Sequence, residues 1–264
     1  MNRIRTADAE IAYQVQGSGP PLVLLHPFPV NHTFWDPAAK HLQQRYRLII
    51  PDLRGHGQSD TGDGPATMEK HALDLNRILN EEQVGRAPFV GVSIGGYILF
   101  EFWRRFPGRV AALVLCNTKA QADGPEAKNN RLQAANDVLE RGTEPFFAGM
   151  ISKVLAETTQ RTRPDLVDGA LRMMRDMSAE DVAAVQRGMA ERPDSLETLK
   201  TINVPTLVIT GDEDQFTGVP EAELMKRHLP SAQLKVISKA GHYSPFEQPD
   251  EAGFLLRQFV ESLR

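Results

Sequence analysis

Cysteine is almost absent from this chain, because Cys116 is the only one among its 264 residues. A single thiol excludes an intramolecular disulfide and is typical of proteins that fold in a reducing compartment. Cys116 ends the apolar run "VAALVLC", so we expect a buried strand residue rather than a reactive thiol.

Long apolar runs and an excess of positive charge are missing as well. No stretch approaches the roughly 18 apolar residues of a membrane-spanning helix, and the first residues, "MNRIRTADAE", contain no apolar signal-peptide core. The formal net charge of −4 disfavours a nucleic-acid-binding surface. We therefore expect a cytoplasmic protein without membrane or nucleic-acid partners. A homo-oligomer is compatible with these features.

The familiar signatures of cofactor and metal sites are also lacking. The chain contains no H-E-x-x-H, no cysteine cluster and no G-x-G-x-x-G, so we expect neither a metal nor a nucleotide cofactor. The composition is otherwise that of an ordinary globular protein, with 41% hydrophobic and 24% charged residues.

Short apolar runs alternate with longer helical patterns along the chain. This alternation predicts an α/β fold built from βαβ units, with a mostly parallel sheet covered by helices on both faces. The expected strands are residues 11–17, 21–28, 46–53, 88–93, 110–117, 205–211 and 233–238. The expected helices between them are residues 34–44, 68–83, 94–106, 219–229 and 249–263.

The alternation of apolar runs and helical patterns stops at residues 119–200, which indicates an inserted, all-helical cap. The segment has four helical stretches and no convincing strand, and the expected core is residues 1–118 and 201–264. The four stretches are residues 125–141, 144–157, 164–177 and 179–191. Methionines of this segment, Met150 and Met174 among them, are expected to line an adaptable apolar pocket, the alternative being packing between cap helices.

Ser93 stands in the stretch "FVGVSIGGY", where an apolar strand gives way to a helical pattern. A turn this tight crowds its central residue against the positions two before and two after it, and both are glycine here, Gly91 and Gly95. Such a turn lifts the serine hydroxyl above the sheet edge, beside backbone N–H groups that can hold an oxyanion. The pattern therefore indicates a nucleophile.

A serine hydroxyl needs an adjacent base, and His242 is the histidine best placed to supply it. The stretch "SKAGHYSPFEQP" puts His242 in a loop just after the last expected strand, at the sheet edge that Ser93 occupies. The other six histidines are expected elsewhere. His41, His71 and His228 lie in helical patterns with polar neighbours and are expected to be solvated, while His26, His32 and His56 are expected to form structural hydrogen bonds.

The orienting carboxylate is expected in "PTLVITGDEDQF", directly after the penultimate strand. Asp214 lies past the Gly211 turn, where the loop can reach inward, and Asp212 is the alternative. An ionised aspartate fixes the imidazole tautomer and stabilises the imidazolium that forms during attack. The order Ser93, Asp214, His242 is that of α/β-hydrolases.

With these residues in this order, the chain resembles the α/β-hydrolase superfamily over essentially its whole length. "PLVLLHPFP" looks like the oxyanion loop, "PDLRGHGQSD" like the D-x-R-G-x-G-x-S turn and "FVGVSIGGY" like the nucleophile elbow. "PTLVITGDED" and "AGHYSPFEQP" look like the acid and histidine loops. Within the superfamily, the chain is similar to capped serine esterases and the 3-oxoadipate enol-lactonase-like group.

The resemblance implies an oxyanion hole made by the backbone N–H groups of Phe28 and Ile94. Pro27 stands where the family usually has glycine, but the expected donor is one residue later. The resemblance also gives the residues around Arg54 a scaffold role: Asp52, Arg54, Gly55, His56 and Gly57.

The resemblance further implies a cofactor-free hydrolase that cleaves a small, partly apolar carboxylic ester or lactone. Phe28, Trp35 and apolar cap residues are expected to form the acyl or alcohol pocket, with core packing as the alternative. The same triad serves enol-lactonases, thioesterases, C–C bond hydrolases and perhydrolases, and the fold also serves non-enzymatic small-molecule receptors. Dehalogenases and epoxide hydrolases of this fold have aspartate where Ser93 stands, which disfavours those activities.

Overall fold

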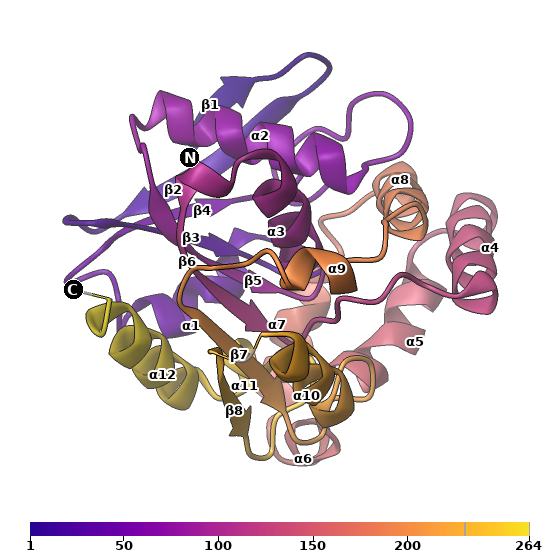
Figure 1. Cartoon of the computed structure of the whole chain (residues 1–264). Helices are drawn as coiled ribbons and strands as arrows, with labels where there is room; N and C mark the ends of the chain where they lie inside the picture. The colour runs from indigo at the N-terminus through magenta and orange to yellow at the C-terminus, as the bar shows by residue number, and fades with distance from the viewer. Residues whose placement is uncertain (230, 264) are drawn as a thin grey trace.

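The computed structural model describes residues 1–229 and 231–263. Within these residues eight strands form one sheet in the order β1-β2-β4-β3-β5-β6-β7-β8 (Figure 1). The β1–β2 and β2–β4 pairs are antiparallel, and every later pair is parallel. The strands are β1 (Asn2–Arg5), β2 (Glu10–Gln16), β3 (Pro21–Leu25), β4 (Arg47–Pro51), β5 (Ala87–Val92), β6 (Val110–Cys116), β7 (Thr206–Gly211) and β8 (Gln233–Ile237).

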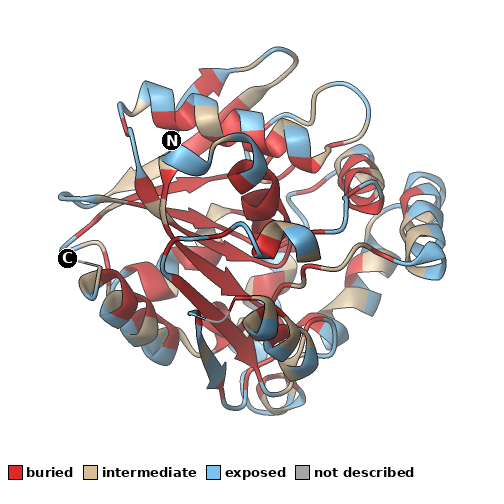
Figure 2. Ribbon diagram, in the orientation of Figure 1, coloured by how far each residue is buried: buried red, intermediate tan, exposed pale blue. Residues whose placement is uncertain are grey.

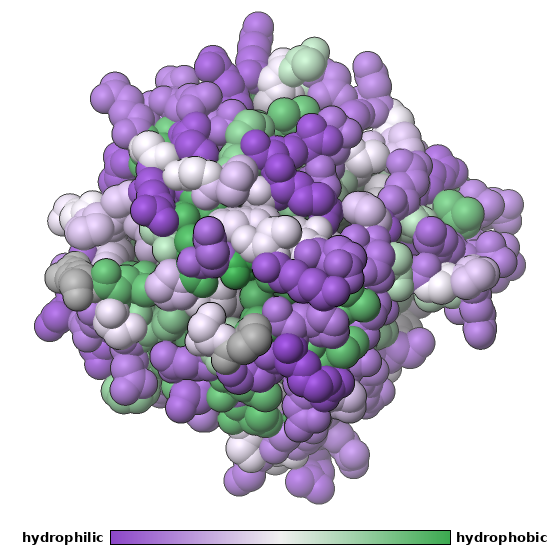
Figure 3. Space-filling view, in the orientation of Figure 1, coloured by the Kyte–Doolittle hydropathy of each residue, from purple (hydrophilic) through white to green (hydrophobic). Residues whose placement is uncertain are grey.

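The central strands are buried almost without interruption, and Figure 2 shows them as the red centre of the molecule. Helices on both faces of the sheet explain why these strands are continuously apolar rather than alternating. The helices of the sheet region are η1 (His32–Trp35), α1 (Asp36–Ala39), α2 (Met68–Glu81), α3 (Ile94–Arg105), η2 (Pro107–Arg109), α10 (Val219–His228), α11 (Ser244–Glu247) and α12 (Pro249–Glu261). The face of the molecule shown in Figure 3 is mostly hydrophilic, with smaller hydrophobic areas between the polar side chains.

The predicted α/β architecture and its seven strands are confirmed, with ends that shift by a few residues. The strand β1 was missed, because "NRIR" buries only Ile4 and has no apolar run. The helix predicted over residues 34–44 is wrong in length: η1 and the single-turn α1 end at Ala39, and turns follow.

Residues 119–200, all of them described, contain helices and no strand. They lie to the right and below in Figure 1 and comprise α4 (Pro125–Arg141), α5 (Glu144–Val154), α6 (Glu157–Thr162), α7 (Pro164–Met174), α8 (Ala179–Ala190) and α9 (Leu196–Leu199). The helix predicted over residues 144–157 ends at Val154, and α6, which was not predicted, begins at Glu157 after a break at Leu155 and Ala156.

A tertiary contact explains this break. The Ala156 N–H donates to the buried Glu247 carboxylate at 2.8 Å, and the Tyr243 N–H donates to the Val154 carbonyl at 3.2 Å. A side chain on Gly241 would lie 2.4 Å from the Ala156 nitrogen. The loop that carries His242 therefore packs against the end of α5 and fixes where it stops.

Besides His242, three histidines lie in the interior: His26, His56 and His71. His26 accepts from the Leu53 N–H through Nε2 at 3.0 Å, which leaves Nδ1 to donate to the Pro27 carbonyl. His56 Nδ1 lies 3.0 Å from the Arg54 carbonyl. The prediction of a structural role for these two is confirmed. The solvated position predicted for His71 is wrong, since α2 turns it inward with Ala72 and Leu75.

Burial keeps these imidazoles neutral. Desolvation lowers the pKa of His26 to about 3 and that of His56 to about 4. Desolvation, with the nearby Arg54 charge, lowers the pKa of His71 well below its usual value. In the unfolded chain the same groups take up protons near the ordinary pKa of about 6.5. The unfolded state therefore binds more protons below about pH 6.5, so the stability of the fold falls as the pH drops.

We expect His71→Leu to weaken this pH dependence, because it removes one group that gains a proton on unfolding. Between about pH 7.5 and about pH 5, the variant should lose about 2 kcal/mol less unfolding free energy than the wild type. Urea unfolding at the two pH values measures this difference. Equal losses in both proteins would show that His71 does not stay neutral in the folded state.

Candidate active site

Ser93 lies between the end of β5 and the start of α3, with φ 55° and ψ −113°. A Cβ on Gly91 would lie 2.5 Å from the backbone of Gly95, and a Cβ on Gly95 would lie 3.0 Å from Leu25. Gly91 therefore has no room for a side chain and Gly95 has very little, in keeping with the crowding that the sequence predicts. The turn leaves Ser93 at the N-terminus of α3, where the first backbone N–H groups have no acceptor within the helix.

A third glycine brings α3 close to the neighbouring strand. A Cβ on Gly96 would lie 2.4 Å from the Thr118 hydroxyl, which itself donates to the Ser93 carbonyl at 2.8 Å. The Ser93 N–H donates to the Cys116 carbonyl at 3.0 Å. The end of β6 therefore holds the backbone of the Ser93 turn.

His242 lies in the loop after β8, and Asp214 lies in the loop after β7. The Nδ1 atom of His242 is 3.1 Å from one Asp214 carboxylate oxygen and 3.0 Å from the other. An ionised carboxylate only accepts hydrogen bonds, so Nδ1 carries the proton and Nε2 keeps its lone pair. In this tautomer the ring can accept a proton at Nε2.

The Asp214 carboxylate is held from several sides. It accepts hydrogen bonds from the backbone N–H groups of Phe216 and Thr217 at 2.8 and 3.1 Å, and from the Thr217 hydroxyl at 2.9 Å. Burial by itself would raise the pKa of Asp214, but His242, the Asn117 amide and the Phe216 N–H lower it well below its usual value. Asp212, the alternative carboxylate, is exposed and accepts from Ser238 instead.

Asn117 was not singled out from the sequence. It is buried just after β6, with a left-handed φ of 43°. Its amide nitrogen donates to Asp214 at 2.9 Å and to the Gly241 carbonyl at 3.1 Å, and its amide oxygen accepts from the Ser244 hydroxyl. Asn117 thereby links the Asp214 loop to the His242 loop. Its position at the end of an apolar strand was the only signal in the sequence.

Ser93 and His242 line one cavity of about 90 Å³. Its other lining residues are Phe28, Tyr97, Lys119, Arg131, Met150, Met189, Phe216 and Thr217. Met150 and Phe28 thus lie where the sequence places the pocket. Trp35 and Met174 do not, because both are fully buried and neither lines the cavity. Trp35 packs edge-on against Phe34 at 5.3 Å, so its apolar surface serves the core.

The two expected oxyanion donors flank this site. Ile94 is the first residue of α3, so its N–H has no intrahelical acceptor. Phe28 lies between Pro27 and Pro29, with a cis peptide bond to Pro29. The buried Tyr243 hydroxyl donates to the Phe28 carbonyl at 3.0 Å, which anchors this loop to the one that carries His242.

The predicted scaffold residues are away from the cavity lining. Asp52 is buried and accepts from the His32 ring at 2.7 Å and from the Gln58 N–H at 2.9 Å. A Cβ on Gly57 would lie 2.5 Å from the Asp52 carboxylate. Arg54 forms a buried ion pair with Asp74 at 2.8 Å. These contacts fix the loop after β4.

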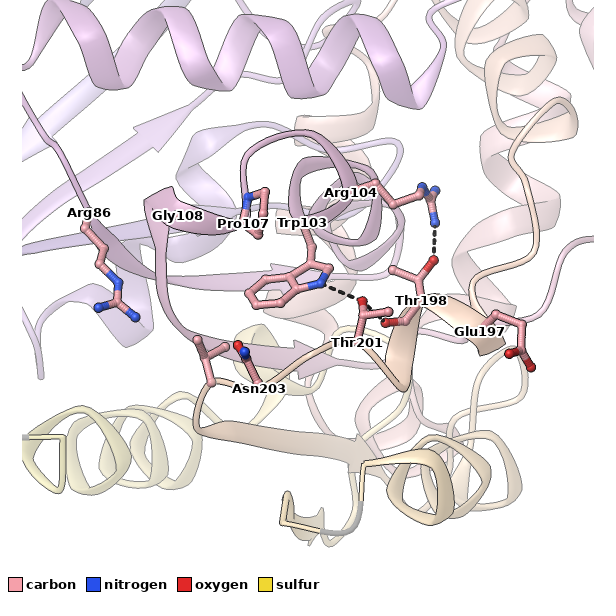
Figure 4. Close-up of a pocket in the computed structure, with 10 residues that line it drawn as sticks. Arg86, Trp103, Arg104, Pro107, Gly108, Glu197, Thr198, Thr201 and Asn203 are labelled. Atoms are coloured by element: carbon pink, nitrogen blue, oxygen red, sulfur yellow. Dashed lines mark hydrogen bonds between the residues drawn. The ribbon is translucent and has the colours of Figure 1, made fainter.

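A larger groove, of about 780 Å³, lies elsewhere and is shown in Figure 4. The Trp103 indole N–H donates to the Thr201 hydroxyl at 2.9 Å, and Arg104 donates to Thr198 at 2.9 Å. Its lining contains no serine, cysteine or histidine and none of the predicted site residues. Among the described residues, no group of three His, Cys, Asp or Glu side chains is arranged to hold a metal ion. None of the helices in this part of the chain combines the length and the apolar composition of a membrane-spanning segment.

Comparison with known proteins agrees with this architecture. Residues 20–249 match the model of the alpha/beta hydrolase fold family. The chain is 27% identical to 3-oxoadipate enol-lactonase 1 of Acinetobacter baylyi, covering 96% of this chain and 94% of that protein.

Two solved structures also superpose closely. The malate-bound thermophilic esterase of Thermogutta terrifontis has 37% identity and a TM-score of 0.96, covering 100% of this chain and 99% of that one. The enol-lactonase of Burkholderia xenovorans LB400 has 22% identity and a TM-score of 0.92, covering 98% and 100%, which shows a shared fold. The chain belongs to the α/β hydrolase fold family and is a hydrolase of the esterase and enol-lactonase-like group.

Proposed function

We propose that this protein hydrolyses carboxylic esters through an acyl-enzyme, with Ser93 as nucleophile, His242 as base and Asp214 as orienting acid. The observation that carries the proposal is the His242 ring, which Asp214 fixes through Nδ1 while the ring lines the same cavity as Ser93. Residues 119–200, which contribute Lys119, Arg131, Met150 and Met189 to that cavity, act as the cap.

In the first step, the Ser93 hydroxyl attacks the ester carbonyl while His242 Nε2 takes its proton. The N–H groups of Phe28 and Ile94 hold the negative oxygen of the tetrahedral intermediate. The imidazolium then protonates the departing alkoxide, which leaves as the alcohol. Water, losing a proton to the same imidazole, adds to the acyl-enzyme, and collapse releases the acid and restores the Ser93 hydroxyl.

A lactone is the second candidate substrate. The similarity of the chain to 3-oxoadipate enol-lactonase 1 of Acinetobacter baylyi supports it. Ring opening uses the same steps, except that the alcohol stays attached to the acyl group. Parallel assays of 4-nitrophenyl esters, an enol-lactone and a peracid reaction separate these activities. Slow or single turnover with tight binding would instead favour a small-molecule receptor.

Replacing the nucleophile tests the mechanism directly. Ser93→Ala should lose activity by roughly 10⁶-fold towards short- and medium-chain 4-nitrophenyl esters, because attack by the hydroxyl is removed. A fluorophosphonate probe followed by peptide mass spectrometry should label Ser93 in the wild type. Turnover at the wild-type rate in Ser93→Ala, or labelling of another residue, would refute the mechanism.

Neighbouring aspartates offer a matched pair for the acid. Asp214→Asn should lower kcat by about 10⁴-fold, because an amide at this position lets the imidazole adopt the wrong tautomer. Asp212 lies two residues away and accepts a hydrogen bond from Ser238, so Asp212→Asn should keep the wild-type kcat. Steady-state kinetics of both variants measure the difference. A large loss in Asp212→Asn with none in Asp214→Asn would reassign the acid.

A further inference from the structure

The helix α6 begins without an acceptor of its own. Its N-cap residue, Ala156, has no side-chain oxygen, although the first N–H groups of any helix lack partners within the helix. Carboxylates from two distant loops take this role. Glu247 accepts from the Ala156 N–H at 2.8 Å, and Glu213 accepts from the Thr158 N–H at 3.0 Å. The start of α6 is therefore held by residues that lie outside the segment 119–200.

These two carboxylates belong to the loops that carry the proposed acid and base. Glu213 immediately precedes Asp214, and its side chain also accepts from the Thr158 hydroxyl at 2.6 Å. Glu247 is the last residue of α11, which begins shortly after His242. Both loops are thus bonded to the same helix start.

Glu247 joins that helix start to the residue before His242. One of its oxygens binds the start of α6, where it also accepts from the Thr159 hydroxyl at 2.6 Å. The other oxygen accepts from the Gly241 N–H at 2.9 Å, and Asn117 donates to the Gly241 carbonyl at 3.1 Å. The backbone just before His242 is therefore held at both of its polar groups.

The Glu247 carboxylate is buried, with 2% of the residue exposed. Burial raises the pKa of Glu247, and the hydrogen bonds from Thr159, Ala156 and Gly241 act in the opposite direction. These donors are all neutral, so none of them brings a positive charge to the carboxylate. The loss of one hydrogen bond would therefore leave buried polar atoms without partners on both sides of the contact.

We infer that Glu247 is a positioning residue for His242, because it fixes the backbone before the imidazole and ties that backbone to the start of α6. The inference rests on the proposed function and adds a residue to its mechanism. Glu247 does not line the cavity with Ser93, so it acts on catalysis through the position of the ring. His242 Nε2 must lie within hydrogen-bond distance of the Ser93 hydroxyl, and a misplacement of about 1 Å can cost about 10²-fold in rate.

A near-isosteric variant tests the role of Glu247. Glu247→Gln replaces one acceptor oxygen with an NH₂ group, which cannot accept from a backbone N–H. The remaining oxygen should stay with Ala156 and Thr159, where two donors meet, so that the Gly241 N–H loses its acceptor. We expect kcat for 4-nitrophenyl butyrate to fall by about tenfold or more with little change in KM.

Two variants of α6 accompany it. Thr159→Val removes the hydroxyl that binds Glu247 and should lower kcat in the same direction by a smaller factor, although Thr159 does not line the cavity. Glu157→Gln makes the same chemical change at the exposed first residue of α6 and should keep the wild-type kcat. An unchanged kcat in Thr159→Val would refute the link between His242 and α6.

The proton on His242 Nδ1 reports the position of the ring without turnover. It is buried and bonded to Asp214 at 3.0 Å, so it should give a slowly exchanging downfield ¹H NMR signal that is absent from His242→Ala. Glu247→Gln should shift and broaden this signal, and Glu157→Gln should not. If Glu247→Gln lowers the melting temperature but leaves the signal and kcat unchanged, Glu247 is only structural and the inference is overturned. If the wild type hydrolyses no ester or lactone, the proposed function fails, and the NMR signal still decides whether Glu247 positions His242.

Discussion

The ionised carboxylate of Asp214 is the point on which the arrangement of the candidate site depends. It is buried, where an unpaired charge is costly, and it stays ionised because donors from three neighbouring strand ends converge on it. Asn117 follows β6, the Phe216 and Thr217 N–H groups follow β7, and His242 follows β8. Only a parallel arrangement of these strands brings their carboxyl ends to one edge. The sheet topology is therefore what allows the buried negative charge of Asp214 to be stabilised.

The same logic explains how much the sequence could reveal. Parallel strands covered on both faces must be continuously apolar, so seven strands were visible, and the glycines around Ser93 followed from the steric demands of a strand-to-helix turn. Constraints of this kind act between residues close together in the sequence, so they can be predicted from it. With the strands placed, the loops carrying Asp214 and His242 had to share the edge with Ser93.

What the sequence could not reveal depends on contacts between distant segments. The break after α5 is set by Glu247 and Gly241, more than eighty residues further along the chain. Trp35 and Met174 are apolar side chains whose composition suits a pocket or a core equally, and only their packing decides for the core. His71 has polar sequence neighbours, yet its position on α2 places it in the interior. Asn117 is recognisable only through the groups that it joins.

Two buried aspartates near the cavity, Asp214 and Asp123, differ in the groups that compensate their negative charge. Donors from backbone and side chains balance the charge of Asp214, and one of them is the imidazole that faces the cavity with Ser93. Asp123 is balanced by three full positive charges, more than it needs, and two of these cations line the cavity. The first arrangement can pass a proton through His242 without exposing the carboxylate. The second leaves net positive charge in a partly buried wall, carried by Lys119 and Arg131.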